Sequence, residues 1–403
     1  EIGVRLVGSE MCIRDRYKAK ERKDMSSQLL STLPFDDGFV MPAEYEPQEA
    51  VWLMVGGLYS HWHSGGFPIR ATQVELAKAI LSAGTKVNIA VPQELYMEVE
   101  YIFRGIDVSI YEMTLDNCWP RDSGAITVKN RKTGEVRGVD FKFNAWGGDM
   151  HGATVCWAND DLAARKMLQI TQMDRYRAPF ILEGGSIAVD GEGTLITTES
   201  CLLNPNRNPH LDRAGIEKTL HDYLGIEKVI WLKRGIDLGE GETDGHIDDI
   251  CAFIGPAEVV CCYTEDKSNE YYETYKECYE MLCRATDAKG RRLKVHKLLA
   301  CAPYKITKVE AETVLVSQGV GYEPDGKWRK EGDNAVPSYA NFLLTNGSLI
   351  FPIYGVETDQ AAIDNITEIV AGRYKVIPVN AREISLNGGS IHCFTQQVSK
   401  AGV

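Results

Sequence analysis

The sequence predicts an α/β fold assembled from repeated helix-and-strand units. Helix and strand patterns alternate along the chain, and no low-complexity linker separates one part from another. Residues 182–189 (Leu-Glu-Gly-Gly-Ser-Ile-Ala-Val) also align with residues 386–393 (Leu-Asn-Gly-Gly-Ser-Ile-His-Cys), and Leu, Gly, Gly, Ser and Ile are shared in register. In a ring of similar units, matching loops converge on one axial channel. An ordinary doubly wound sheet also alternates helices and strands. The match between residues 182–189 and 386–393 favours a repeated architecture over such a sheet.

The first predicted unit is a strand, a helix and a strand. Residues 50–55 are an apolar run typical of a buried strand. Residues 73–82 carry apolar side chains at helical spacing, and Gly84 follows as a C-cap. Residues 87–91 are rich in β-branched side chains and predict the second strand.

The same pattern returns along the chain, giving about five units in all. Glycines mark its turns: Gly225 ends a predicted helix at 212–224, and Asn346-Gly347 joins two strands in a hairpin. The other predicted helices are 161–172, 271–285 and 359–370. The other predicted strands are 108–111, 125–129, 178–182, 186–189, 195–198, 228–232, 247–254, 293–298, 339–345, 348–352 and 374–379.

The composition is that of a globular protein with a large core. Of its 403 residues, 44% are hydrophobic and 25% are charged. The formal net charge of −13 at pH 7 argues against partners such as nucleic acid and anionic membranes, and it permits cationic small molecules. No apolar run approaches the length that spans a bilayer.

The cysteines predict a reduced, cytoplasmic protein. There are 11 of them, an odd number with no Cys-x-x-Cys pair, so we expect neither a disulfide framework nor a structural zinc site. Residues 1–24 are charged, lack apolar periodicity and precede Met25. We expect these residues to be a non-native or disordered N-terminal extension, and residues 25–403 to form a single domain.

Several loops place polar residues at the starts of predicted strands. In the aligned loops, Glu183 corresponds to Asn387 and Val189 corresponds to Cys393. Two further loops, 117–124 and 241–249, precede apolar strands in the same way, and loops on a rigid scaffold are the usual place for functional groups. The Gly-Gly pair before Cys393 predicts a tight loop that enters a short strand, although a cysteine there could also be a plain core residue.

His246 and Asp248 are two residues apart, so on a strand both side chains would point to the same face. Such a pair suits proton transfer beside a cation; a surface ion pair and half of a metal site are the alternatives. We expect no metal, because no second cluster has suitable spacing. His61-x-His63 lies in a Ser/Gly-rich loop that suits a substrate lid or solvent better.

Six motifs, in order, give the chain a family resemblance. They are 119–122 (Trp-Pro-Arg-Asp), 143–148 (Phe-Asn-Ala-Trp-Gly-Gly), 182–185 (Leu-Glu-Gly-Gly), 204–209 (Asn-Pro-Asn-Arg-Asn-Pro), 243–248 (Thr-Asp-Gly-His-Ile-Asp) and 388–397 (Gly-Gly-Ser-Ile-His-Cys-Phe-Thr-Gln-Gln). Together they resemble the agmatine deiminase family of guanidine-modifying enzymes. The resemblance implies the pentein fold, a five-bladed α/β propeller with pseudo-fivefold repeated units around a central active-site channel.

The resemblance implies a site for a guanidinium cation. Asp122 and Asp248 would accept its paired hydrogen bonds, and Glu183 would contact the guanidinium or the histidine. Trp119 would stack on the cation, and Trp146 would form a second wall.

The resemblance also implies a catalytic cysteine. Cys393 would attack the guanidinium carbon as a thiolate, favoured by the bound cation and by protonated His246. His246 would then protonate the departing ammonia and activate water. The S-alkylthiouronium intermediate would be hydrolysed, so agmatine would give N-carbamoylputrescine and ammonia, on a route to putrescine, with no metal or organic cofactor.

Other functions remain open at this point. A deiminase of free arginine would need a partner for the α-carboxylate, one acting on peptidyl arginine would need an open groove, and an amidinotransferase would pass the amidino group to an amine. A pentein binding module without chemistry has no need of the catalytic set Asp122, Glu183, His246, Asp248 and Cys393. The family also suggests a homodimer.

Overall fold

The computed structural model describes residues 27–56, 62–154, 156–236, 243–311 and 330–402. The predicted extension at residues 1–24 lies outside these ranges, as do His61 and residues 241–242 of a predicted polar loop. The fold and the site are therefore built from the described ranges alone.

Five sheets share one arrangement, in which an antiparallel strand pair is followed by a helix and a strand parallel to the second. In one of them, β17 (Leu343–Thr345) pairs with β18 (Ser348–Ile353), α11 (Asp359–Val370) follows, and β19 (Lys375–Asn380) returns beside β18. Two of the other four units consist of β6 (Ile126–Asn130), β7 (Val136–Lys142), α6 (Ala163–Thr171) and β8 (Arg175–Ile181), and of β9 (Ala188–Val189), β10 (Thr194–Thr198), α8 (Arg213–Leu224) and β11 (Lys228–Leu232). A further unit consists of β12 (Cys251–Gly255), β13 (Glu258–Tyr263), α9 (Tyr272–Arg284) and β14 (Lys294–Leu299). The last consists of β20 (Gln396–Ser399), β3 (Gln48–Met54), α2 (Phe67–Ser82) and β4 (Lys86–Val91). These mixed sheets confirm the predicted α/β class and differ from the single sheet of a doubly wound fold.

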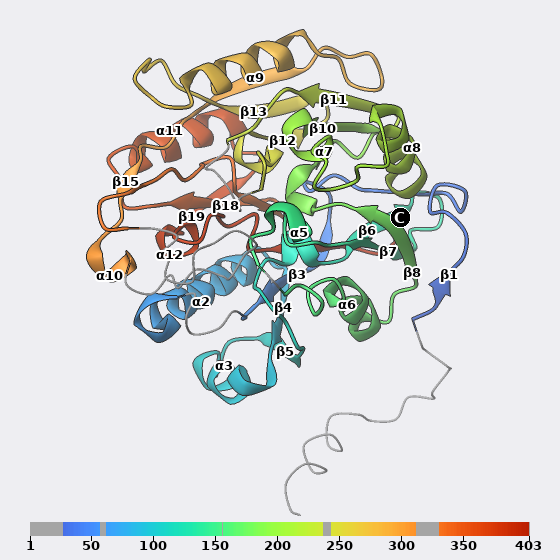
Figure 1. Ribbon diagram of the computed structural model, residues 1–403, viewed down its shortest axis with the longest axis horizontal. Coiled ribbons are helices and arrows are strands. Elements are labelled where there is room, and N and C mark those ends of the chain that lie inside the picture. Colours follow the sequence, from blue (N-terminus) through green and yellow to red (C-terminus); the bar gives the residue numbers. More distant parts are fainter. Residues whose placement is uncertain (1–26, 57–61, 155, 237–242, 312–329, 403) are drawn as a thin grey trace, which may run out of the picture.

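The crossover helices lie on the outside of the molecule. Figure 1 shows α9, α8, α6, α2 and α11 around the periphery, with the sheets inside them. Further strands extend the sheets: β5 (Val108–Glu112) runs beside β4, while β1 (Leu29–Leu30) and β2 (Phe39–Val40) flank the sheet of β6, β7 and β8. A separate pair is formed by β15 (Tyr304–Lys305) and β16 (Asn334–Ala335).

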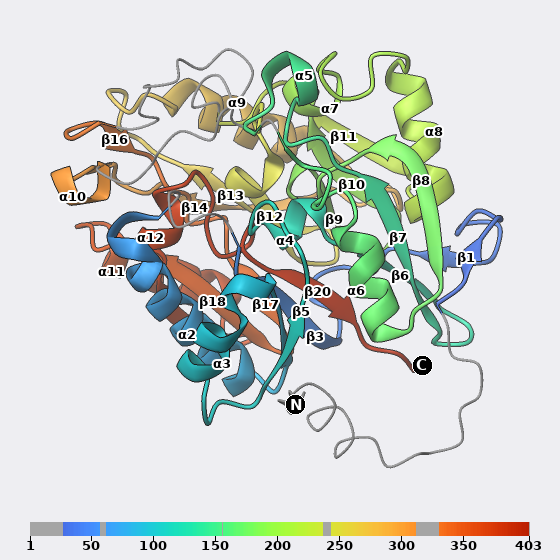
Figure 2. The same ribbon diagram turned by 60° about the horizontal axis from the view of Figure 1, so that its bottom comes forward.

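The last strand joins the two ends of the described chain. β20 runs beside β3 (Figure 2) and pairs with it antiparallel. Gln397 lies opposite Val51 in this pairing. On the side facing β6, Ser399 donates its backbone N–H to Thr127 Oγ1 at 3.1 Å. The segment that follows Cys393 is thus fixed to two neighbouring sheets.

Local sequence signals explain several element ends. Asp212 caps α8 by accepting the N–H of Gly215 at 2.9 Å, and Gly225 ends this helix with φ of 72°. Asn346 and Gly347 have φ of 41° and 78°, which confirms the predicted hairpin turn between β17 and β18.

Some element bounds differ from the predictions. The helix predicted to begin at residue 73 begins at Phe67, because Pro68 suits its first turn. Two of the longer strands, β7 and β13, were not predicted, nor were the two-residue strands β1, β2, β15 and β16. In β7 a glycine, Gly138, interrupts the pattern, and a Cβ there would lie 2.1 Å from Leu168. The short helices were also not predicted: α3 (Tyr96–Ile102), α4 (Pro120–Ser123), α5 (Gly148–His151), α7 (Glu199–Leu202), α10 (Lys308–Ala311) and α12 (Arg382–Ser385).

Three predicted strands near the polar loops are wrong in part. The strand predicted at 247–254 begins at Cys251, after a 3₁₀ turn at Ile247–Asp249. The adjacent carboxylates of Asp248 and Asp249 both face the cysteine turn, which a strand would not allow because its side chains alternate. The strand expected around Cys393 begins at Gln396, and the one predicted at 339–345 begins at Leu343.

The core consists of apolar side chains from both sides of the sheets. The larger cluster includes Leu53, Ile89, Val260 and Phe351, all fully buried. The ten cysteines of the described residues are all free thiols. Among the described helices, none combines the length and the apolar character that crossing a membrane requires.

Candidate active site

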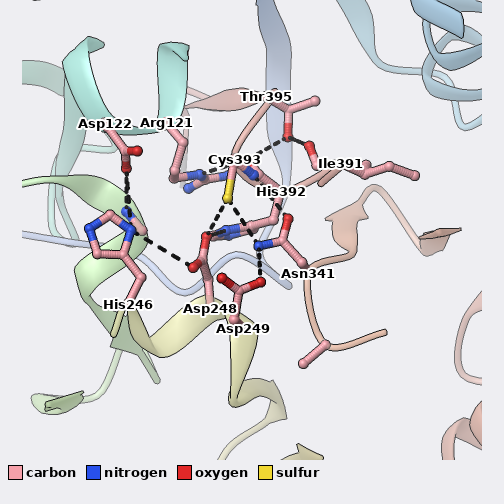
Figure 3. A network of polar contacts seen from close by, with 12 residues as sticks. Arg121, Asp122, His246, Asp248, Asp249, Asn341, Ile391, His392, Cys393 and Thr395 are labelled. Atoms are coloured by element: carbon pink, nitrogen blue, oxygen red, sulfur yellow. Dashed lines mark hydrogen bonds and ion pairs between the residues drawn. The ribbon is translucent and has the colours of Figure 1, made fainter. Parts of the chain in front are cut away.

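Cys393 lies in a buried turn, and both the oxygen and the nitrogen of the Asn341 side-chain amide contact it. The Asn341 Oδ1 accepts the backbone N–H of Cys393 at 3.2 Å, and its Nδ2 lies 3.0 Å from the sulfur (Figure 3). The same Nδ2 donates to Asp249 Oδ1 at 3.0 Å. The thiol in turn lies 3.2 Å from Asp248 Oδ2.

His246 is surrounded by three carboxylates from three other positions in the chain. Its Nδ1 lies 3.9 Å from Asp122 Oδ1 and 4.0 Å from Asp248 Oδ1, and its Nε2 lies 4.0 Å from Glu183 Oε2. His246 and Asp248 therefore do lie together as predicted. The predicted reason was wrong, because they stand on a turn and not on one face of a strand.

Asp122 is fixed through both of its oxygens. The Trp146 indole N–H donates to Oδ2 at 3.0 Å, and the backbone N–H of Gly185 donates to Oδ1 at 3.1 Å. Ala145 and Trp146 both have left-handed backbones, with φ of 53° and 61°. Such a conformation is costly for residues other than glycine, and it is typical of functional loops.

Glu183 is bound on one side only. Arg207 Nε lies 2.7 Å from Glu183 Oε1, and both side chains are fully buried. Arg207 Nη1 also donates to Asp244 Oδ2 at 2.6 Å. The other oxygen of Glu183 faces His246.

The aligned Gly-Gly pairs, 184–185 and 388–389, both line the site although they lie far apart in the sequence. A Cβ at Gly185 would lie 2.6 Å from His246 Nδ1 and 3.0 Å from Asp122 Oδ1. A Cβ at Gly389 would lie 2.4 Å from the Trp119 ring and 2.9 Å from Cys393 Cβ. In both pairs the second glycine is needed because functional side chains approach its backbone closely.

Several buried polar atoms at the centre of the site have no hydrogen-bonding partner among the described residues. They are both ring nitrogens of His246, Glu183 Oε2 and Asp248 Oδ1. Unpaired buried polar groups are costly, and in native proteins they mark sites that a ligand completes. The two unpaired oxygens belong to carboxylates, so this part of the site can accept hydrogen bonds.

The electrostatics of the site depend on burial and on the neighbouring charges. Burial raises the pKa of the Cys393 thiol well above its ordinary value, and the carboxylates of Asp248 and Asp249 raise it further. Burial also raises the pKa of Asp122; nearby His246 opposes this effect. The thiol is therefore uncharged at neutral pH in the free protein.

Asp248 has the opposite shift. Burial acts to raise its pKa, but the hydrogen bond and the charge of His392, together with the charge of His246 and the hydrogen bond from Cys393, outweigh burial, so its pKa lies below the ordinary value. Asp248 is thus a stable carboxylate beside a neutral thiol.

The two tryptophans occupy different positions. Trp119 packs edge-on against Phe394 at 5.5 Å and lies beside Gly389, on the Cys393 side. Trp146 packs against Phe143 at 5.1 Å and binds Asp122. The expected stacking of either ring on a cation remains a prediction.

Sequence reasoning missed four residues around the site. Arg207 and His392 lie within two of the six motifs, which was the available signal, and Asn341 lies in a predicted strand; all three are buried polar residues in the structure. Glu44 precedes β3 in a Pro-punctuated segment with no motif. Its side chain nevertheless binds both Arg121 and His392.

Two groups of side chains have metal-ligand atoms within 4.8 Å of one another: Glu183, Cys201 and His246, and Asp190, Glu192 and Asp287. Arg207 already binds Glu183 in the first group. In the second group, Lys289 and Arg291 bind the carboxylates.

The fold and the site define a class of protein with known members. Residues 40–399 match the sequence profile of the family described as Porphyromonas-type peptidyl-arginine deiminase, and the chain belongs to this enzyme family. A curated Enterococcus faecalis protein that carries the name "Putative agmatine deiminase" is 43% identical over 377 residues, covering 93% of this chain and 100% of that protein. One of the same name from Pectobacterium atrosepticum is 43% identical over 380 residues, covering 94% of this chain and 100% of its own length.

Solved structures agree with this assignment. The structure described as agmatine deiminase of Enterococcus faecalis catalyzing its reaction has a TM-score of 0.85 and 41% identity, covering 93% of this chain and 100% of that one. An agmatine deiminase from C. jejuni with substrate bound has a TM-score of 0.73 and 26% identity, covering 90% and 97%.

Proposed function

We propose that this protein hydrolyses agmatine to N-carbamoylputrescine and ammonia through a covalent intermediate on Cys393. The observation that carries the proposal is the set of unpartnered buried atoms of Glu183, His246 and Asp248 beside the thiol. A guanidinium presents several N–H donors in one plane and one positive charge. It would pair with the carboxylates of Glu183, Asp122 and Asp248, with Trp119 against its face.

The bound cation would also activate the nucleophile. In the free protein burial raises the pKa of Cys393 and the surrounding carboxylates raise it further, which keeps the sulfur protonated. A guanidinium between those carboxylates neutralises their charge and favours the thiolate. The thiolate would thus form only when the electrophilic carbon is in place.

His246 would carry the protons of both half-reactions. It would accept the thiol proton as the thiolate attacks the guanidinium carbon, then give a proton to the departing ammonia. In the second step it would take a proton from water, whose oxygen attacks the S-alkylthiouronium carbon and releases the ureido product. Glu183, 4.0 Å from His246 Nε2, would orient the ring.

Agmatine is favoured over arginine by the state of the arginines at the site. Arg207 is bound to both Glu183 and Asp244, and Arg121 is bound to Glu44 through Nη1, so the charge of each arginine is already balanced by a carboxylate of this chain. The relatives named as agmatine deiminases support the same substrate. Peptidyl arginine, which the family description names, is the second candidate.

The proposal extends to the architecture, the compartment and the oligomeric state of the protein. The five recurring sheets support a five-bladed pentein propeller with the site on its axis. We further infer that residues 25–403 form a single catalytic domain, that residues 1–24 are an extension to it, and that the protein acts in the cytoplasm as a homodimer, without a cofactor and without nucleic-acid or membrane partners.

The test is incubation with agmatine, arginine and an arginyl peptide, measuring ureido product and ammonia. We expect turnover of agmatine alone, and loss of about a thousandfold or more in Cys393→Ala. Cys118→Ala is the matched control, because Cys118 is another buried thiol on the loop before Trp119. Full activity of Cys393→Ala would refute the mechanism, and turnover of the peptide alone would refute the substrate.

A further inference from the structure

His392, the residue before the proposed nucleophile, lies between two carboxylates. Its Nδ1 is 2.8 Å from Asp248 Oδ2, and its Nε2 is 2.8 Å from Glu44 Oε1 and 3.0 Å from Oε2. A neutral imidazole has one donor and one acceptor nitrogen, and the acceptor would face a carboxylate oxygen without a proton between them. Both nitrogens therefore donate, and the ring is a buried imidazolium.

Glu44 is in turn held firmly in place. Its Oε1 accepts from Arg121 Nη1 at 2.9 Å, and its backbone carbonyl accepts from Gln48 Nε2 at 2.8 Å. The Arg121 Nε also donates to the His392 carbonyl oxygen at 3.2 Å. Glu44 and Arg121 thus fix the ring and the backbone of His392 together.

The consequence appears at Asp248. Its Oδ2 accepts from both His392 Nδ1 and the Cys393 thiol, whereas its Oδ1 faces His246 at 4.0 Å (Figure 3). The imidazolium thereby sets the rotation of the carboxylate: one oxygen is assigned to the thiol and the other to the cation.

We propose that His392, anchored by Glu44, is a positioning residue that holds Asp248 ionised and oriented between the nucleophile and the guanidinium. The substrate part of this inference rests on the proposed function; the effect on the thiol does not. The titratable and charged groups that face the pair are Glu44 and Arg121 around His392, and His246, Asp122 and the Cys393 thiol around Asp248.

Two variants separate the charge of His392 from its hydrogen bond. His392→Asn retains a neutral N–H donor near the Nδ1 position and removes the positive charge. Glu44→Gln leaves the ring in place and removes one of the two carboxylates, Glu44 and Asp248, that raise the pKa of His392. In Glu44→Gln, His392 is then charged in acid and neutral in alkali.

The first measurement is the pH midpoint of Cys393 alkylation by iodoacetamide without substrate, followed by mass spectrometry of its peptide. Loss of a buried cation near the sulfur disfavours the thiolate, so the midpoint should rise by about one pH unit or more in both variants. His296→Asn is the matched control. It breaks a His–carboxylate pair of 2.7 Å with Glu258, on β14 outside the site, and should leave the midpoint unchanged.

The second measurement is the pH profile of kcat/KM for agmatine. His392→Asn should move the acid limb upward by about one unit, because Asp248 loses the cation that lowers its pKa. Glu44→Gln should leave the acid limb in place, because His392 is still charged there.

The outcomes are distinct. An unchanged alkylation midpoint in both folded variants overturns the inference, whatever the substrate. A parent protein that does not hydrolyse agmatine refutes the proposed function, while the alkylation result still decides the role of His392. If His392→Asn does not fold, as judged by circular dichroism, Glu44→Gln alone decides.

Discussion

Arg207 and Glu183 form an ion pair of 2.7 Å with no solvent access to either side chain. Removing one partner of such a pair leaves a buried charge without compensation, at a cost of about 3–5 kcal/mol. We therefore expect Arg207→Met to lower the free energy of unfolding by about this amount, measured by urea denaturation. Arg213→Met, which breaks an exposed pair with Glu199, should cost about 1 kcal/mol or less. Equal effects of the two variants would contradict the buried pair.

Gly185→Ala should strongly lower kcat/KM for agmatine while the protein remains folded. The added Cβ would lie 2.6 Å from His246 Nδ1 and 3.0 Å from Asp248 Oδ2, so both proposed functional groups must move. We expect kcat/KM for agmatine to fall by about a hundredfold or more, since displacements of this size in an active site have such effects. Gly215→Ala in α8, where the nearest side-chain atom is 3.2 Å away, should retain parental kinetics.

Asp160 should make the protein less stable as the pH rises. Burial raises its pKa to about 7, and its Oδ1 accepts the N–H groups of Asp116 and Asn117 at 2.8 and 3.2 Å. Between about pH 4 and 7 the carboxyl is protonated in the folded state and ionised in the unfolded state. Its contribution to the free energy of unfolding is therefore lost as the pH rises through this range. Asp160→Asn keeps the acceptor oxygen and should exceed the parent in Tm at pH 8 but not at pH 5. A variant destabilised equally at both pH values would show that Asp160 acts through its hydrogen bonds alone.

Trp146→Phe should weaken substrate binding through Asp122. In the parent, the indole N–H lies 3.0 Å from Asp122 Oδ2 and lowers the pKa of that carboxyl. The variant loses this donor, so the pKa of Asp122 rises and more of the carboxyl is protonated at a given pH. A lost hydrogen bond to a charged group costs about 1.5–3 kcal/mol, or about a tenfold to hundredfold rise in KM for agmatine. Trp157→Phe, a partly buried tryptophan outside the motifs, serves as the control.

Local patterns predicted much of the fold because their signals are short-range. The helix at 359–370 and the strand at 228–232 match the structure, as does the Asn346-Gly347 turn. The 3₁₀ turn at Ile247–Asp249 escaped prediction, because its shape depends on contacts with Asn341 and His392, far away in the chain. An apolar run around it appears as a strand when those contacts are unknown.

The motifs carried the five proposed catalytic residues, but they did not give a role to Arg207 or His392, which lie within them. The sequence motifs named Asp122, Glu183, His246, Asp248 and Cys393, and the structure brings all five together. Glu44 could not be found, because its contact with His392 spans 348 positions and a lone glutamate after a proline has no distinguishing pattern.

The position of Cys393 just before β20 has a consequence for biosynthesis. The strand that closes the first sheet begins three residues after the thiol and pairs with β3, which is made more than 300 residues earlier. Until β20 pairs with β3, one edge of β3 is open and the turn that carries Cys393 is not tied to the first sheet. We therefore expect the pairing of the last strand with β3 to complete the proposed active site late in folding.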